Sequence, residues 1–321
     1  MRWSDDTYLS VYLLLGTTTY CCADTSRFTF EKSWSPQSLN LTDWNFRSGS
    51  KTSFGSVSTI KDPFSTNDDT CYDIFYTRQS YGIEGGNNSG VHVNCKPLDD
   101  QPANRAMLSY EIGFPQDFNW VKGGKLPGLF GGSTNAGCTG GREANGANCF
   151  SMRLMWRSGG LGEVYTYLPK ILNNDLCARP DATCNLEYGS SIGRNFKFKP
   201  GAWNKVELFV QLNTGNEPNG YLKLYIDNKL QVDLSKLVYR TYDDMFVDTF
   251  EFSSFFGGST PAYATPVDTN VYIKNIRFQI DTGFLNGTMI TLDSSSTEYN
   301  PIDKVTIVFL SILTLFISRA L

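Results

Sequence analysis

Hydrophobic and polar residues alternate along residues 150–169, which read FSMRLMWRSGGLGEVYTYLP. In the first half of this stretch the even positions are large and apolar, and the odd positions are mostly polar or cationic. Because successive side chains of a β-strand point to opposite faces, residues 150–157 are predicted to form a strand with one face on a core. A glycine-rich turn at 158–162 and a second alternating segment at 163–168 follow. The stretch therefore predicts a β-hairpin.

Closing the hairpin at this turn pairs odd positions with odd positions: Arg157 with Glu163, Met155 with Tyr165, and Arg153 with Tyr167. Both strands then place their polar side chains, including Ser151, on the same face. An ordinary solvated face with cross-strand pairs is one interpretation. Two phenols beside guanidinium groups are more typical of a site for a polar, anionic, ring-shaped ligand.

Further short segments with β character are separated by turn residues along the rest of the chain. The predicted strands are 71–80, 91–95, 107–114, 196–200, 203–212, 221–226, 229–234, 248–256 and 271–280, and residues 173–195 are predicted to be a loop. Between residues 119 and 132, repeated glycines and a proline exclude a helix and indicate close approach to a neighbouring strand or a ligand. Short strands at this density predict an all-β fold, a jelly-roll β-sandwich of two antiparallel sheets.

The net charge of the chain limits the kinds of molecule that it can bind. The chain has 321 residues and a formal net charge of −4, without a block of basic residues. This excludes a nucleic-acid-binding footprint, and an anionic ligand would need a local cationic site. We expect residues 24–70 to form an N-terminal arm with the first strands, and residues 71–283 to form the jelly-roll domain. We expect a monomer that uses no cofactor.

Both ends of the chain resemble processing signals. Residues 1–23 combine a short apolar run with small residues and are predicted to be a signal peptide. Residues 305–321 form a short apolar tail after a polar linker, 284–304, in which Ser294 is the predicted attachment site of a glycolipid anchor. A plain C-terminal membrane helix is the alternative, although the apolar run is short for a bilayer span. Either arrangement predicts an extracellular, membrane-tethered domain at the cell surface.

The cysteines agree with an extracellular location. Outside the predicted signal peptide there are six, an even number that suggests three disulfides. Short loops favour Cys138–Cys149 and Cys177–Cys184, which leaves Cys71–Cys95. A zinc site is the weaker alternative, because the chain has no CxxC motif and a single histidine. Three glycosylation sequons also fit a secreted surface, and they lie at Asn40, Asn87 and Asn286.

The glycine-rich stretch and the hairpin resemble a known family. KGGKLPGLFGG, followed by CFSMRLMWR and GEVYTYLP, is similar to the pattern of polysaccharide lyase family 14. WNKVELFVQLN, YLKLYID and FEFSSFFGG resemble later strands of that family, so the resemblance covers roughly residues 71–280. It implies a β-jelly roll and an enzyme that cleaves uronic-acid polymers such as alginate, including polymannuronate, or glucuronan.

The resemblance also implies a set of site residues: Lys125 from the GGKLPG motif, Ser151 and Arg153 on the central strand, and Tyr165 and Tyr167 on the next. Four of these five are the residues that the hairpin alternation places on one face. The loop between Lys125 and Ser151 departs from the family pattern, because it looks longer and carries its own cysteines.

Such a lyase removes the proton at C5 of a uronate and expels the oxygen at C4. The reaction needs a neutralised carboxylate, a base near C5 and an acid near the leaving oxygen. Arg153 suits the first role, because its guanidinium matches a carboxylate bidentately. Lys125, Tyr165 and Tyr167 are the candidates for base and acid, and their division stays open. Ser151 is interpreted as a positioning donor in substrate binding.

Other functions compete with this interpretation. A jelly-roll glycoside hydrolase would use paired carboxylates, and no strand carries them. A hydrolytic triad would need a histidine, and His92 is interpreted as a strand residue. The main alternative is a non-catalytic lectin that binds acidic polysaccharide on the same scaffold, and a structural surface protein is the next. We expect an acidic polysaccharide and the membrane as partners, and no metal.

Overall fold

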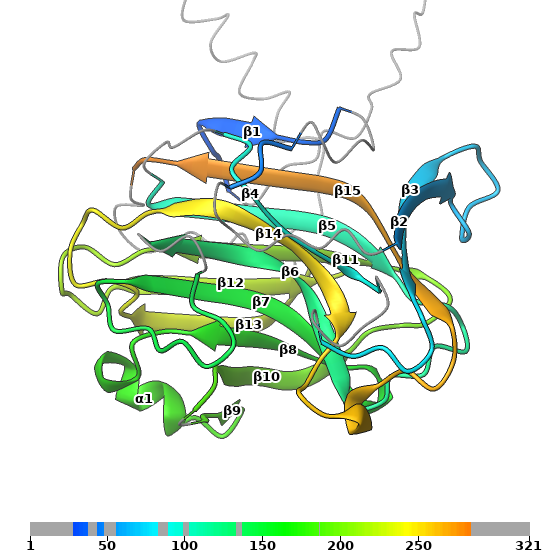
Figure 1. Ribbon diagram of the computed structural model, residues 1–321. Helices are drawn as coiled ribbons and strands as arrows, with labels where there is room; N and C mark the ends of the chain where they lie inside the picture. The colour runs from blue at the N-terminus through cyan, green and yellow to red at the C-terminus, as the bar shows by residue number, and fades with distance from the viewer. Residues whose placement is uncertain are drawn as a thin grey trace, which may run out of the picture. The chain divides into compact units, whose positions relative to one another are not determined.

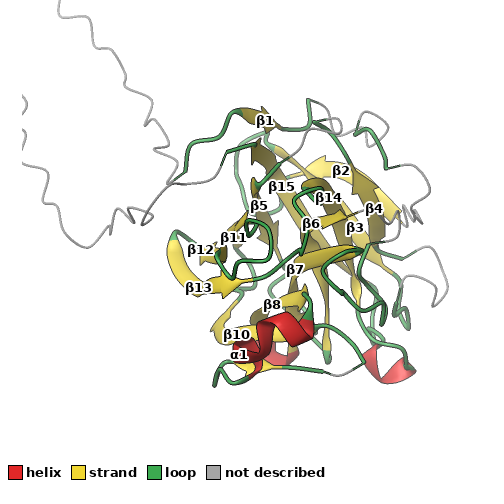
Figure 2. Cartoon of the chain, turned by 90° about the vertical axis from the view of Figure 1, so that its left-hand side faces the viewer, coloured by secondary structure: helices red, strands yellow, loops and turns green. Residues whose placement is uncertain are grey.

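The computed structural model describes residues 28–37, 44–47, 56–82, 89–98, 103–132, 137–185 and 187–283. Residues Phe30–Asn286 form one compact unit. The described residues are mostly strands joined by loops, with short helical segments (Figure 2). The strands form two antiparallel sheets packed face to face (Figure 1), which confirms the predicted jelly-roll β-sandwich.

The first sheet follows the order β13, β12, β11, β5, β15, β3 and β2, with β1 also paired to β15. Its strands are β13 (Lys229–Leu237), β12 (Gly220–Ile226), β11 (Trp203–Gln211), β5 (Arg105–Gly113), β15 (Thr269–Asp281), β3 (Thr70–Tyr76), β2 (Ser56–Lys61) and β1 (Lys32–Trp34). The strands β11, β12 and β13 follow one another in the chain, as do β2 and β3, whereas β5 pairs with the distant strands β11 and β15. These long-range pairs join the parts of the sheet.

The second sheet follows the order β4, β14, β6, β7, β8, β10 and β9. Its strands are β4 (Val91–Cys95), β14 (Val247–Phe256), β6 (Gly123–Gly132), β7 (Cys149–Arg157), β8 (Leu161–Tyr167), β10 (Ser190–Lys197) and β9 (Ala182–Thr183). In Figure 1 the strands β14, β6, β7, β8 and β10 follow one another down the front of the molecule. The short helix α1 (Asn174–Cys177) lies between β8 and β9 in the chain. β14, from the C-terminal part, is thus inserted between β4 and β6.

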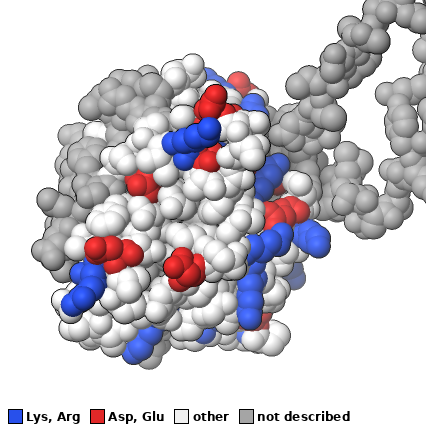
Figure 3. Space-filling view, turned by 90° about the vertical axis from the view of Figure 1, so that its right-hand side faces the viewer, with Lys and Arg blue, Asp and Glu red and all other residues white. Residues whose placement is uncertain are grey.

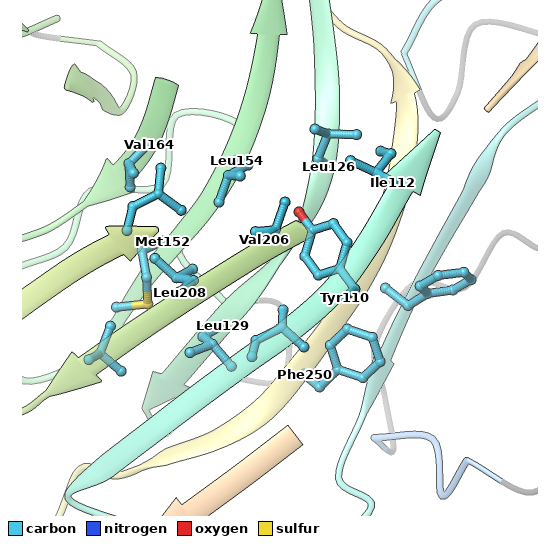
Figure 4. Packing of buried hydrophobic residues seen from close by; sticks show 14 of the residues in the cluster. Tyr110, Ile112, Leu126, Leu129, Met152, Leu154, Val164, Val206, Leu208 and Phe250 are labelled. Carbon is cyan, nitrogen blue, oxygen red and sulfur yellow. The ribbon is translucent and has the colours of Figure 1, made fainter. Parts of the chain in front are cut away.

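The core lies between the two sheets. Figure 4 shows side chains of the first sheet, such as Tyr110 and Leu208, packed against Leu129, Met152 and Leu154 of the second. All of these side chains are almost completely buried. The even positions of β7 face this core, as the alternation predicts.

The opposite side of the second sheet, here called the outer face, collects polar and aromatic side chains that do not belong to this core. Strand alternation and their mutual contacts place them there. The outer face comprises His92, Asn94, Lys125, Ser151, Arg153, Met155, Arg157, Glu163, Tyr165, Tyr167, Ser191, Glu251 and Ser253.

The glycine-rich stretch approaches a neighbouring strand. It forms the strand β6, and a Cβ atom added at Gly128 would lie 2.3 Å from the carbonyl oxygen of Met152 on β7. Only glycine allows this separation, which brings the backbones of β6 and β7 together beside Arg153. The prediction of a loop over 173–195 is wrong in part, because β10 begins at Ser190 and ends at Lys197.

The predicted hairpin exists, but its register differs by two residues. Met155 pairs with Glu163, Arg153 with Tyr165, and Ser151 with Tyr167. The chain reverses within residues 158–160, where Gly159 and Gly160 have φ values of 69° and 78°. Residues 161 and 162 therefore join the strand instead of the turn. A shift of two keeps every side chain on its predicted face, because the side-chain period of a strand is two.

One predicted disulfide is wrong: Cys71 and Cys95 are both free and buried. Cys95 belongs to the core between the sheets, whereas Cys71 alternates with the core residue Tyr72 and points away from that core. Thiols on opposite sides of a sheet cannot reach disulfide geometry. Burial raises the pKa of the Cys71 thiol to about 12, which makes it unreactive. The other two pairs are confirmed: Cys138 with Cys149, and Cys177 with Cys184.

Several predictions fall outside the described residues. They are the signal peptide, the sequons at Asn40, Asn87 and Asn286, the anchor site at Ser294 and the apolar tail 305–321. Within the part of the chain that the structure describes, no helix is long and apolar enough to cross a membrane. Membrane tethering and the monomeric state therefore stay predictions.

Candidate active site

Lys125 and Tyr165 are in direct contact on the outer face. The Nζ atom of Lys125 lies 3.6 Å from the centroid of the Tyr165 ring and 3.1 Å from Sδ of Met155. A β-bulge aims this lysine: Lys125 pairs with Met155 but Gly128 pairs with Arg153, so β6 contains one extra residue between the two pairs. Bulges commonly redirect a side chain next to a functional site.

The surroundings of Lys125 favour its neutral amine. Burial lowers the pKa of Lys125 well below its ordinary value, and the positive charges of Arg153 and Arg157 lower it further. The carboxylates of Glu163 and Glu251 act in the opposite direction without reversing the shift. A neutral lysine carries a lone pair, so the side chain can accept a proton.

Tyr165 and Tyr167 pack edge to face, with ring centroids 5.6 Å apart. Burial raises the pKa of the Tyr165 phenol above its ordinary value, and Tyr167 raises it further. The backbone N–H of Gly189 donates to the Tyr165 hydroxyl at 3.0 Å, so the phenol can still donate its own proton. A Cβ atom at position 189 would lie 2.9 Å from Cζ of Tyr165 and 2.8 Å from Cε2 of Tyr167. Glycine at this position therefore makes room for both tyrosines.

A disulfide-closed loop, residues 138–149 (the disulfide loop), contacts three of the predicted site residues. Both cysteines pack with the Tyr167 ring in a small apolar cluster. The hydrogen bonds run from Ser151 Oγ to the Cys138 carbonyl (2.6 Å), from Arg153 Nη2 to Thr139 Oγ1 (3.2 Å), and from the Gly141 N–H to Tyr167 Oη (3.2 Å). This loop is the segment in which the sequence departs from the family pattern, and it contacts the predicted site residues directly.

Arg153 is almost completely buried, with 2% of the residue exposed. Its Nη2 atom lies 2.7 Å from Oε1 of Glu251, which is itself buried. Nδ1 of His92 lies 3.6 Å from the same carboxylate oxygen and 3.1 Å from the hydroxyl of Ser253. Burial lowers the pKa of His92, and Arg153 lowers it further, against the effect of Glu251. A neutral His92 leaves Glu251 to balance the charge of Arg153.

Sequence reasoning did not assign His92 or Glu251 to the site. His92 is a strand residue, as interpreted, but it lies on the outer face beside the predicted site residues. The alternation in VHVNC and FEFS carries a signal, because it puts both side chains opposite core positions. No local sequence pattern predicts that β4, β14 and β6 are neighbours, since these strands are far apart in the chain.

Positive and negative charges are mixed on one side of the molecule. On the side shown in Figure 3, basic and acidic side chains are interspersed among uncharged residues, without a large area of one sign.

In the described ranges, no group of three or more His, Cys, Asp and Glu side chains could hold a metal ion.

Comparison with known proteins identifies the family. The family profile described as Polysaccharide lyase 14 matches residues 65–276, which include all five predicted site residues. The chain belongs to polysaccharide lyase family 14. The family resemblance of the two central motifs is thereby confirmed.

Solved structures of similar proteins include lyases. A marine PL-14 alginate lyase from Aplysia kurodai is 29% identical, with a TM-score of 0.68, and the match covers 79% of this chain and 100% of that one. The alginate lyase vAL-1 from a Chlorella virus shares the fold at 20% identity and a TM-score of 0.60, over 78% of this chain and 100% of that one. A fungal endo-β-1,4-glucuronan lyase from Trichoderma reesei shares it at 12% identity and a TM-score of 0.51, over 78% and 96% of the two chains.

A curated relative is longer than this family 14 chain. Exolysin of Paramecium bursaria Chlorella virus 1 is 26% identical over 198 residues, or 53% of this chain. The match spans only 29% of the length of Exolysin.

Opening the disulfide loop of this family 14 protein is expected to impair the site. In a Cys138→Ser/Cys149→Ser variant the loop no longer holds its contacts to Ser151, Arg153 and Tyr167. We expect the specificity constant on the polymer substrate to fall roughly 10- to 100-fold, and the free energy of unfolding to fall by about 3 kcal/mol. Steady-state kinetics and urea unfolding measure the two effects.

The matched control is Cys177→Ser/Cys184→Ser, which opens the other short disulfide. Among the described contacts, that disulfide has none to the predicted site residues. It should therefore lower stability without a comparable loss of activity. Equal kinetic losses in the two variants would show that the disulfide loop does not position the site.

Proposed function

We propose that this chain cleaves polymers of uronic acids by β-elimination, with Lys125 as the base and Tyr165 as the acid. The observation that carries the proposal is the contact between the Lys125 amine and the Tyr165 ring, 3.6 Å from Nζ to the centroid. The pKa shifts of the two groups are opposite: the lysine pKa is lowered and the tyrosine pKa is raised. One group is therefore prepared to accept a proton and the other to donate one.

The proposed reaction begins with removal of the C5 proton by the neutral Lys125 amine. The electron pair left at C5 forms the C4–C5 double bond as the C4–O4 bond breaks, and Tyr165 protonates the departing oxygen. Positive charge next to the substrate carboxylate makes the C5 proton acidic enough to leave. Arg153 is the residue that we propose for this role, because its guanidinium lies close enough to act electrostatically on Lys125.

The placement of base and acid favours particular uronates. Because Lys125 and Tyr165 lie on the same face of one sheet, they would approach the sugar from the same side. In β-D-mannuronate and β-D-glucuronate the C5 proton and the C4 oxygen lie on the same side of the ring. In α-L-guluronate they lie on opposite sides. We therefore propose a syn elimination on mannuronate-rich alginate or on glucuronan.

The ultraviolet absorbance of the unsaturated uronate product tests this proposal. Purified protein is mixed with polymannuronate, polyguluronate and glucuronan in separate reactions. We expect the absorbance to rise with polymannuronate or glucuronan and to stay flat, or nearly so, with polyguluronate. Binding of a polymer without any rise would support the lectin alternative, and the absence of both would contradict any action on uronic acids.

The pH dependence follows from the two shifts. Only neutral Lys125 is a base, so kcat/KM should increase as the pH rises through the lowered pKa of this lysine, and should do so below the usual lysine range near 10.4. Only protonated Tyr165 is an acid, and its raised pKa keeps it protonated across that rise. We therefore expect a plateau on the alkaline side, measured as kcat/KM against pH. A decline of kcat/KM over the same interval would contradict these roles.

A further inference from the structure

We propose that Arg157, Glu163 and Arg194 form a binding subsite for a second carboxylate of the substrate chain, away from the sugar that is cleaved. This inference rests on the proposed function, since it takes a uronic-acid polymer as the ligand. We call these three residues the arginine-pair subsite.

The subsite is organised by one buried carboxylate. Glu163 is 0% exposed, and its two oxygens contact different arginines. Nε of Arg157 lies 2.8 Å from Oε1, and Nε of Arg194 lies 2.5 Å from Oε2. The hydroxyl of Ser191 also donates to Oε1, at 2.8 Å. Glu163 thus holds two guanidinium groups in fixed orientations.

The charges of the subsite do not cancel. Burial acts to raise the pKa of Glu163, but the hydrogen bonds from Arg157, Arg194 and Ser191 lower it below its ordinary value, so the group is ionised. Two arginines and one carboxylate leave one net positive charge. By contrast, Arg153 is buried and matched by Glu251. The side chain of Arg157 is 21% exposed and that of Arg194 is 42% exposed, so the unbalanced charge is accessible to a ligand.

A purely structural ion pair accounts poorly for the second arginine. Arg157 alone provides Glu163 with a close partner in the neighbouring strand. An additional ion pair with a half-exposed arginine contributes little stability, because water screens it and the long side chain loses conformational freedom. The register of β10 against β8 shifts between Ile192 and Phe196, and Arg194 lies within this irregularity. Such bulges redirect side chains next to functional sites.

The subsite lies beside the proposed reaction centre on the outer face. Met155 pairs with Lys125 on one side and with Glu163 on the other, so one residue of β7 separates the base from the subsite. Ser191 pairs with Tyr165. A uronan has a carboxylate on every sugar. A chain that crosses β6, β7, β8 and β10 would therefore bring one carboxylate to the reaction centre and a later one to the arginine pair.

Affinity for chains of different length tests the subsite. We would measure the Kd of mannuronate and glucuronate oligosaccharides, in a graded length series, by calorimetry. The protein is the full chain with Tyr165→Phe, to prevent cleavage, with and without Arg194→Ala. The control is Arg277→Ala, which removes the same charge from an exposed arginine of the first sheet that donates to Ser33. Long oligosaccharides should bind with a lower Kd than short ones, and we call the ratio of the two Kd values the length advantage. Arg194→Ala should reduce the length advantage about three- to tenfold.

The possible results test the subsite and the proposed reaction independently of each other. A length advantage that survives Arg194→Ala, or falls equally in Arg277→Ala, would overturn the subsite. The absence of any binding would overturn it too. A reduced advantage specific to Arg194→Ala supports it, even if the protein without substitutions gives no unsaturated product, in which case the proposed lyase reaction alone fails.

Discussion

Replacing Lys125 with alanine is expected to reduce kcat on the preferred uronan by roughly 10²- to 10⁴-fold, the usual contribution of a positioned general base. The amine accounts for this effect because it is the one group of the contact pair whose pKa is shifted toward the proton-accepting form. Substrate binding should change less, since the arginines of the outer face remain. The absorbance assay gives kcat and KM for the variant and for the unmodified protein.

The matched control for Lys125 is Lys122→Ala. Lys122 is an exposed lysine three positions earlier, and its Nζ lies 5.4 Å from the Tyr263 ring rather than near Tyr165. This variant should keep its activity. A small primary amine added to Lys125→Ala should restore part of the rate, because it can occupy the space left by the side chain. If Lys122→Ala loses as much activity as Lys125→Ala, then general charge and not a base at position 125 explains the effect.

Replacing Tyr165 with phenylalanine is expected to cause a loss of kcat of similar size, about 10²- to 10⁴-fold. The substitution removes the hydroxyl and keeps the ring that packs against Lys125 and Tyr167. An interaction made only in the transition state should lower kcat and kcat/KM equally. Substrates with an activated leaving group at C4 need less protonation, so they should lose much less rate in this variant.

Two other tyrosine variants serve as controls for Tyr165→Phe. Tyr242→Phe, at an exposed tyrosine, should be active and should exclude a general effect of removing a phenol. Tyr167→Phe should lose less activity than Tyr165→Phe, because the Tyr167 hydroxyl accepts from the disulfide loop and the Lys125 amine contacts the other ring. A larger loss in Tyr167→Phe, with normal rates on activated substrates, would assign the acid to Tyr167.

Local patterns in the sequence determined the fold class and much of the outer face. Alternation in β7 and β8 separated the core side chains from Ser151, Arg153, Tyr165 and Tyr167 before any pairing was known. This prediction survived an error of two residues in register, because a side chain changes face only when the register moves by an odd number. Short loops likewise sufficed for the disulfides Cys138–Cys149 and Cys177–Cys184, whose partners are close in the chain.

Contacts between distant segments were decided only by the tertiary structure. Strand order places Glu251 and His92 beside Arg153, and no local pattern encodes that β14 lies between β4 and β6. The same limit explains the wrong pairing of Cys71 with Cys95, since counting cysteines does not reveal that the two thiols lie on different sides of a sheet. Burial also arises from the assembled sheets, and it is the first cause of the opposite pKa shifts of Lys125 and Tyr165. The sequence alone thus determined which residue types share a face, and the packing of the sheets decided their contacts, charges and protonation.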